Sequence, residues 1–136
     1  MVILDTHIAV WLLAGEARLT ESVAYPYIEQ ASQRGSLRIA SISLFELSRL
    51  NGDGRLRLDL PLSDLFETLL NTPGLQIAEL DPRVALESLS LENFPGDETD
   101  RVICATARAL RGSLVTADAE IVDYAKSGGL RVIPVQ

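Results

Sequence analysis

The chain has 136 residues, of which 47% are hydrophobic, which is enough for one domain with a buried core and short for two. Its 19 acidic residues outnumber 12 basic ones, and the net charge of -7 argues against a nucleic-acid coat protein or a membrane-surface protein. A local site could still bind nucleic acid through metal ions and a few arginines. We expect a single unit spanning residues 1–136.

Short apolar segments alternate along the chain with segments whose apolar residues recur at helical spacing. The predicted strands are residues 2–4, 37–40, 75–78, 114–115 and 131–135. The predicted helices are residues 7–14, 21–33, 43–50, 63–70, 83–89, 99–110 and 119–125. A turn is predicted at 51–55, and loops at 71–74 and 93–96. Since no hairpin signal joins the strands, the pattern predicts an α/β fold with a mostly parallel sheet covered on both faces.

The cysteine content and the N-terminus indicate where the protein works. Cys104 is the only cysteine, and its apolar neighbours predict a buried, inert thiol in a reducing compartment. The first residues lack the basic segment and cleavage site of a signal peptide, and Asp5 and His7 interrupt their apolar stretch. We therefore expect a cytoplasmic protein that does not bind membranes.

Polar side chains follow the first and the fourth predicted strands. Asp5 and Thr6 come directly after the first strand, and the segment LVTAD places Thr116 and Asp118 after the fourth. In an open parallel sheet, ligands bind beyond the carboxyl ends of the strands, where loops run into helices. If these two strands are neighbours, both carboxylates face one cleft.

Two further segments contribute acids. In GDETDR, Asp97 and Asp100 lie three residues apart and share one side of a helix start. In SISLFEL, Glu46 is a lone acid among apolar residues of a predicted helix, and Ser43 lies three residues before it. A carboxylate in such surroundings is costly unless a cation or a donor satisfies it.

These acids admit two interpretations. Asp5, Asp97 and Asp118 each precede a predicted helix, where aspartate is a preferred N-cap, and Asp100 could complete a capping box. Glu46 could be an ordinary exposed helix residue. Alternatively, the acids converge on one edge of the sheet, where their repulsion would raise their pKa values unless a divalent cation held them together. Oxygen ligands of this kind suit Mg2+ or Mn2+.

The same segments resemble a known family. The segments ILDTH, SISLFEL, DETDR followed by VICATA, and LVTAD are similar, in order and spacing, to the four motifs of the PIN domain. The stretch GRLRLDLPL from Gly54 is similar to the region that follows the glutamate helix in bacterial VapC-type toxins of toxin–antitoxin pairs. The resemblance covers essentially the whole chain. It implies a three-layer α/β/α sandwich around a mostly parallel sheet.

The resemblance also implies an activity, a metal and partners. The implied activity is that of an endoribonuclease dependent on one or two Mg2+ or Mn2+ ions, which would activate water and stabilise charge on the reacting phosphodiester. The implied catalytic and metal-binding residues are Asp5, Glu46, Asp100 and Asp118. The implied supporting residues are Asp97, Thr116, Thr6 and Ser43. The implied partners are an RNA substrate, a cognate antitoxin and a second copy of the chain in a homodimer.

Several arginines are candidates for contacts with RNA. Arg49, Arg55 and Arg57 could line the approach to the cleft and bind the RNA backbone, or they could belong to a solvated turn. Arg101 follows Asp100 and could contact a phosphate, or it could form a local ion pair.

The remaining aromatic and apolar residues leave a second class of function open. His7, the only histidine, lies four residues before Trp11; packing on one helix face explains this spacing, and we assign His7 no catalytic role. A further group could form an apolar surface for a partner or belong to the core, namely Trp11, Leu12, Leu44, Phe45 and Leu47. The alternative to a nuclease is therefore a non-catalytic binding module whose acids only cap helices.

Overall fold

A five-stranded sheet forms the centre of the protein. The computed structural model describes residues 1–56, 59–127 and 129–136. The strands are β1 (Val2–Leu4), β2 (Leu37–Ala40), β3 (Leu75–Ala78), β4 (Ser113–Thr116) and β5 (Arg131–Pro134). Every neighbouring pair is parallel, and the order across the sheet is β3-β2-β1-β4-β5. The predicted α/β class is confirmed.

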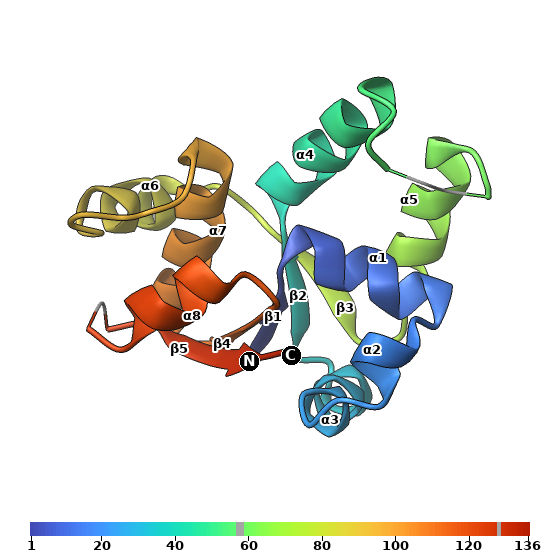
Figure 1. Ribbon diagram of the computed structural model, residues 1–136, viewed down its shortest axis with the longest axis horizontal. Coiled ribbons are helices and arrows are strands. Elements are labelled where there is room, and N and C mark those ends of the chain that lie inside the picture. The colour runs from blue at the N-terminus through green and yellow to red at the C-terminus, as the bar shows by residue number, and fades with distance from the viewer. Residues whose placement is uncertain (57–58, 128) are drawn as a thin grey trace.

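Helices cover both faces of this sheet (Figure 1). They are α1 (Thr6–Ala14), α2 (Ala17–Thr20), α3 (Tyr25–Arg34), α4 (Ser41–Gly52), α5 (Leu62–Leu70), α6 (Pro82–Leu89), α7 (Glu98–Ala109) and α8 (Ala119–Ala125). One layer consists of α1, α2, α3 and α5, and the opposite layer of α6, α7 and α8. The three-layer α/β/α sandwich implied by the family resemblance is therefore present. Within the described ranges, no helix is long and apolar enough to cross a membrane.

Two apolar cores, one on each face, hold the layers together. Successive residues of a strand point to opposite faces, so Leu4 packs into the core under α1 and α3, while Ile3 packs into the core under α7. The second core contains Cys104, which is fully buried, and burial raises the pKa of its thiol. The predicted inert thiol is thus placed in the core.

Two predicted elements differ from the structure. The helix expected over residues 21–33 starts later than predicted: residues 21–24 form a turn, and α3 begins at Tyr25 with Pro26 in its first turn. Proline lacks an N–H and is tolerated only at such a position in a helix. The short helix α2, which precedes the turn at 21–24, was not predicted. The turn expected over 51–55 starts later, because α4 continues through Gly52, and Gly54 takes the left-handed conformation with φ of 68°.

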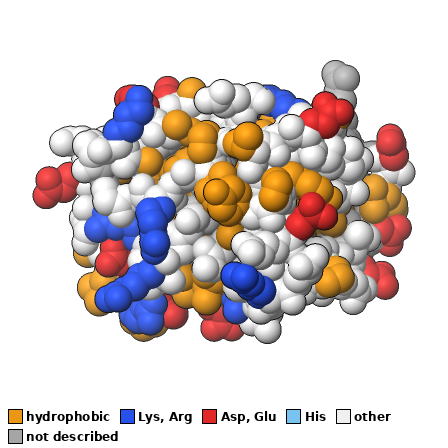
Figure 2. Space-filling model, turned by 90° about the horizontal axis from the view of Figure 1, so that it is seen from below, with side chains coloured by type: hydrophobic (Ala, Val, Ile, Leu, Met, Phe, Trp, Pro, Cys, Tyr) orange, Lys and Arg blue, Asp and Glu red, His pale blue; other side chains and the backbone are white. Residues whose placement is uncertain are grey.

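Arginines gather around the C-terminal end of α7. Most of the Lys and Arg side chains on the face shown in Figure 2 lie toward the side of α6, α7 and α8. Arg83, Arg108 and Arg111 line a cavity of about 590 Å³, and the guanidinium of Arg83 donates to the carbonyl of Ala109. Arg131 donates to the carbonyl of Arg111. Cations stabilise the C-terminal end of a helix, so these arginines have a structural role.

Candidate active site

The site forms where the order of the strands reverses. After β1 the chain continues to β2 and β3 on one side, whereas β4 and β5 lie on the other. Leu4 is in register with Val115, and the backbone N–H of Asp5 donates to the carbonyl of Val115 at 3.0 Å. The first and fourth strands are therefore neighbours, which is the condition for both carboxylates to face one cleft. Ligand sites of open parallel sheets lie at this kind of reversal.

A pocket of about 360 Å³ opens at this edge of the sheet. All the acids singled out from the sequence line it, namely Asp5, Glu46, Asp97, Asp100 and Asp118. The other lining residues are His7, Trp11, Arg18 and Ala117. We call this cavity the acidic pocket. Five carboxylates from four separate segments of the chain therefore meet in one place.

One hydroxyl group links the acids at the ends of β1 and β4. Thr116 Oγ1 donates to Asp5 Oδ2 at 2.6 Å and accepts a hydrogen bond from the backbone N–H of Asp118 at 3.1 Å. The backbone N–H of Thr6 donates to Asp5 Oδ1 at 2.8 Å. Asp5 is only 8% exposed, and this burial raises the pKa of its carboxyl, whereas the bond from Thr116 lowers it. Thr116 thus supports a buried carboxylate and fixes its orientation.

Replacing this hydroxyl is expected to affect both stability and metal binding. Thr116→Val keeps the shape of the side chain but leaves Asp5 Oδ2 without its donor, which costs about 2 kcal/mol for a buried charged group. We expect urea denaturation to show this loss. We also expect Mn2+ affinity, measured by calorimetry, to fall by about 10- to 100-fold, as for other residues that orient a metal ligand.

Thr106→Val is the matched control for this substitution. Thr106 is also buried, and its hydroxyl donates to the carbonyl of Val102 at 2.7 Å within α7. We expect this variant to bind Mn2+ with wild-type affinity. Equal Mn2+ affinities for Thr116→Val and Thr106→Val would contradict the role given to Thr116.

A second hydroxyl pair joins α1 to α4, the helix that carries Glu46. Thr6 Oγ1 donates to Ser43 Oγ at 3.0 Å, and both residues are fully buried. Glu46 lies one turn beyond Ser43 and is partly buried. Burial raises the pKa of Glu46, a hydrogen bond with Thr6 lowers it, and the charges of Asp5 and Asp97 raise it further. The helix therefore presents a carboxylate that its surroundings disfavour in the charged form.

The acids of α7 form a capping box at its start. The backbone N–H of Asp100 donates to Asp97 Oδ1 at 2.9 Å, and the backbone N–H of Asp97 donates to Asp100 Oδ2 at 3.4 Å. Asp5 and Asp118 also cap their helices. Burial, together with the charges of Asp97 and Asp5, raises the pKa of Asp100 to about 7. The two interpretations of the aspartates are thus compatible, because the same residues cap helices and converge on the pocket.

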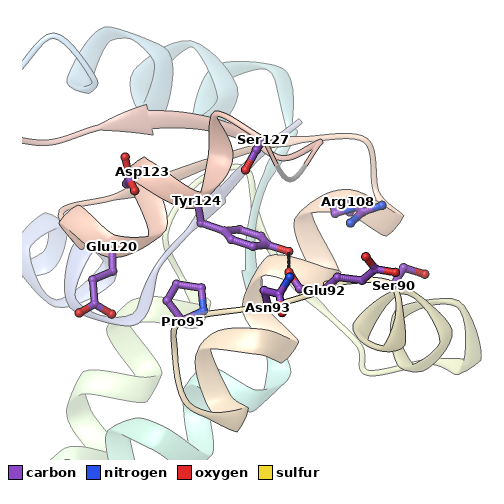
Figure 3. A pocket seen from close by; sticks show the side chains of 9 residues that line it. All are labelled: Ser90, Glu92, Asn93, Pro95, Arg108, Glu120, Asp123, Tyr124 and Ser127. Atoms are coloured by element: carbon purple, nitrogen blue, oxygen red, sulfur yellow. Dashed lines mark hydrogen bonds between the residues drawn. The ribbon is translucent and has the colours of Figure 1, made fainter.

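The loop before α7 is anchored to α8 across a separate cavity. This cavity has a volume of about 600 Å³ and shares no lining residue with the acidic pocket (Figure 3). The hydroxyl of Tyr124 donates to the carbonyl of Glu92 at 2.9 Å, and its ring meets Phe94 edge-on at 5.3 Å between centroids. These contacts hold the loop that leads to Asp97.

The chemistry of the acidic pocket suits a hard divalent cation. Carboxylate oxygens are the ligands that Mg2+ and Mn2+ prefer, and the raised pKa values of Asp5, Glu46 and Asp100 reflect burial and a mutual repulsion that a cation would relieve. Within the described ranges, no three His, Cys, Asp or Glu side chains are already grouped closely enough to hold a metal. Mg2+ usually keeps several water ligands and is held by one or two carboxylates, so a cation in this pocket would complete its coordination with water.

The described arginines among those predicted to contact RNA, namely Arg49, Arg55 and Arg101, do not line this pocket. Arg49 and Arg55 are exposed and do not line it, and the Arg49 guanidinium lies 5.9 Å from the centroid of the Phe45 ring. Arg57 lies outside the described residues. Arg101 donates from Nη1 to the carbonyls of Ser88 and Leu91, both at 2.9 Å. Its guanidinium therefore buttresses the loop between α6 and α7, and a contact with phosphate stays a prediction.

Two basic residues without a predicted role, His7 and Arg18, also line the pocket. His7 is exposed at the start of α1 and shares the pocket with Trp11, and Arg18 projects from α2. The position of Arg18 was missed because α2 was not predicted. Gly15, which directly follows the helix of Trp11, was the available signal that the chain turns back toward the pocket there.

The apolar residues considered for a partner surface differ in how far they are buried. Leu47 is 1% exposed and belongs to the core, whereas Phe45 is 58% exposed. Trp11, Leu12 and Leu44 are partly buried against the core under α1. The apolar group therefore does not form one continuous exposed surface.

The sequence matches a known protein family, and this match agrees with the fold and with the acidic pocket. Residues 2–127 match the PIN domain, and the chain belongs to the PIN domain family. Among individual proteins, it is 36% identical over 118 residues to Ribonuclease VapC22 of Mycobacterium tuberculosis (strain ATCC 25618 / H37Rv), and the alignment covers 86% of each chain.

Solved structures agree with the fold. VapBC2 from Rickettsia felis, bound to a DNA fragment from its promoter, matches with a TM-score of 0.70 and 19% identity over the whole of both chains. DNA-bound VapBC from Salmonella typhimurium matches with a TM-score of 0.68 and 16% identity, covering 99% of this chain and 98% of that chain. A toxin–antitoxin complex from Klebsiella pneumoniae matches with a TM-score of 0.65 and 19% identity, covering 100% of this chain and 98% of that chain. At these identities the matches establish a shared fold.

Proposed function

We propose that this protein is a divalent-metal-dependent endoribonuclease and the toxin of a toxin–antitoxin pair that inhibits translation. The observation that carries this proposal is the acidic pocket: five carboxylates from four segments line one cavity at the reversal point of the sheet. The identity with Ribonuclease VapC22 supports RNA as the substrate. The geometry alone would suit DNA equally well.

The residues of the acidic pocket would have different roles in hydrolysis. Asp5, Glu46, Asp100 and Asp118 would hold one or two Mg2+ or Mn2+ ions, with Asp97 as an additional nearby acid. When bound, such ions lower the pKa of water and stabilise charge on the phosphate. One of the carboxylates would accept the proton of the attacking water. Attack by water, and not by the ribose 2′-hydroxyl, would leave 5′-phosphate and 3′-hydroxyl ends.

The same relatives suggest the partners. A structural match is itself described as a toxin–antitoxin complex, and we propose that a cognate antitoxin covers the acidic pocket of this protein. We further propose that the chain forms a homodimer and acts in the cytoplasm, where its RNA substrate is found.

Cleavage of RNA by the purified protein tests this function. End-labelled tRNA and ribosomal RNA fragments are incubated with antitoxin-free protein in Mg2+ or Mn2+. We expect discrete cuts that EDTA abolishes and that added Mn2+ restores, since the carboxylates alone cannot activate water at neutral pH. The cut ends should ligate without prior phosphorylation, as 5′-phosphate ends do.

The alternative function, a non-catalytic binding module, predicts a different result. Its acids would serve only as helix caps, so the protein would neither cut RNA nor bind Mn2+ specifically. That combination of results would overturn the proposed nuclease.

A further inference from the structure

An arginine held against an aromatic ring lies at the rim of the acidic pocket. The guanidinium carbon of Arg18 lies 4.7 Å from the centroid of the Trp11 ring, a cation–π distance. Both side chains line the pocket, and Arg18 is exposed. The positive charge therefore stands in solvent beside five carboxylates.

The backbone fixes the position of Arg18 relative to Trp11. Gly15, with φ of 65°, ends α1 in the left-handed conformation, where glycine carries no steric penalty. The backbone N–H of Glu16 donates to the carbonyl of Trp11 at 2.9 Å, so the chain folds back over α1. Leu19, next to Arg18, is fully buried and anchors α2 to the core. The arginine is thus mounted on an ordered turn.

Within the described part of the chain, Arg18 forms no ion pair with the carboxylates that line the acidic pocket. Among the described residues that line the pocket, Arg18 is the only arginine or lysine. The ion pairs formed within the described part of the chain are Arg108 with Glu87 and Lys126 with Asp123. Arg18 is therefore held by the Trp11 ring, and its N–H donors are not taken up by a carboxylate.

We propose that Arg18, stacked on Trp11, binds a phosphate of the RNA strand that flanks the bond to be cut, and so positions the strand over the acids. This inference rests on the proposed ribonuclease function. Five carboxylates repel a phosphodiester, and a fixed cation at the rim opposes that repulsion. A guanidinium suits this task because it is always charged, planar and able to donate two parallel hydrogen bonds to one phosphate.

Binding of RNA by position-18 variants tests the inference. The probe is a fluorescein-labelled 12-nucleotide single-stranded RNA of randomised sequence, with Ca2+ present and KCl varied, because a backbone contact does not depend on sequence. We expect Arg18→Gln to bind about tenfold more weakly and the slope of log affinity against log salt to become shallower by about 0.7. Arg18→Lys should restore the salt slope, since it restores the charge.

A control and a local reporter accompany this measurement. Arg34→Gln removes an exposed arginine from the last turn of α3, outside the pocket, and should leave affinity and slope unchanged. Trp11 is the only tryptophan of the chain, so its fluorescence reports on the rim itself. RNA should change the Trp11 emission of the wild type, and this change should be reduced in Arg18→Gln.

Cleavage kinetics separate a positioning role from a purely structural one. With an RNA that the wild type cuts, Arg18→Gln should raise KM by about tenfold while kcat and the melting temperature stay close to wild type. RNA affinity, salt slope and KM that are all unchanged in Arg18→Gln would overturn the inference. If the wild type binds the RNA but cuts none, the proposed nuclease fails, whereas the binding comparison still decides the role of Arg18.

Discussion

Asp100→Asn is expected to lower the rate of RNA cleavage by at least about 100-fold without weakening the metal-free fold. Asparagine keeps the size of the side chain but removes a negatively charged oxygen ligand. In the folded protein, burial and the charge of Asp97 raise the pKa of Asp100 to about 7. At pH 8 the charged carboxylate therefore lowers the free energy of unfolding of the metal-free protein. Removing the charge should leave this free energy unchanged or raise it.

Two measurements check this separation of activity from stability. Initial cleavage rates in Mn2+ give the activity, and thermal melts in EDTA at pH 8 give the stability. After discounting for the solvent exposure of a half-buried group, we expect a gain of about 1 kcal/mol, or about 3 °C in Tm for a chain of this length. The control is Asp64→Asn, which changes an exposed acid of α5 outside the pocket. If Asp100→Asn cuts RNA as fast as the control does, Asp100 is not part of the catalytic machinery.

The second large effect is a pH dependence of stability that Mn2+ reverses. The pKa of Asp100 is about 7 in the folded chain, whereas an unfolded aspartate has a pKa of about 3.9. Between these values the folded state binds more protons than the unfolded state, so this group lowers the free energy of unfolding as the pH rises from about 4 to 7. Above pH 7 the effect levels off. Asp5 and Glu46, whose pKa values are also raised, act in the same direction.

Thermal melts across this pH range, with and without Mn2+, measure both effects. The difference in Tm between wild type and Asp100→Asn isolates the contribution of Asp100. In EDTA we expect the Tm of the wild type to fall relative to that of Asp100→Asn as the pH rises. Mn2+ binds deprotonated carboxylates, so it should stabilise the wild type increasingly toward pH 8, by about 2.7 kcal/mol at 100 times its Kd. A Tm difference that does not vary with pH, or no response to Mn2+, would contradict this account of the pocket.

The local pattern of residues was sufficient for the fold class and for most elements. Short apolar segments and helical spacing predicted all five strands and most helices, because these periodicities reflect which face of each element is buried. The pattern was misread where backbone chemistry overrides it. Pro26 favours the first turn of a helix, so the helix expected over residues 21–33 begins only at Tyr25, as α3. The short helix α2, which ends at Thr20, was not predicted.

The acids of the site were also recognised from sequence, although their arrangement was not. A residue's type and its place after a strand or at a helix start identified Asp5, Asp97, Asp100 and Asp118, because aspartate at such a place can cap a helix or bind a metal. Sequence alone could not choose between these two roles. The parallel pairing of β1 with β4, and the packing of α4 and α7 over the same edge, brought the carboxylates into one pocket.

Only the tertiary structure determined the contacts between residues that are far apart in the chain. The bond from Thr116 to Asp5 joins residues 111 positions apart, and it depends on which strands are neighbours. The orientation of Arg101 toward the loop before α7 and of Arg18 toward Trp11 depends on the path of the surrounding backbone. Residue types and their periodicity are local properties that a sequence displays directly, whereas the direction of a side chain and its distant neighbours follow from the packing of the whole chain.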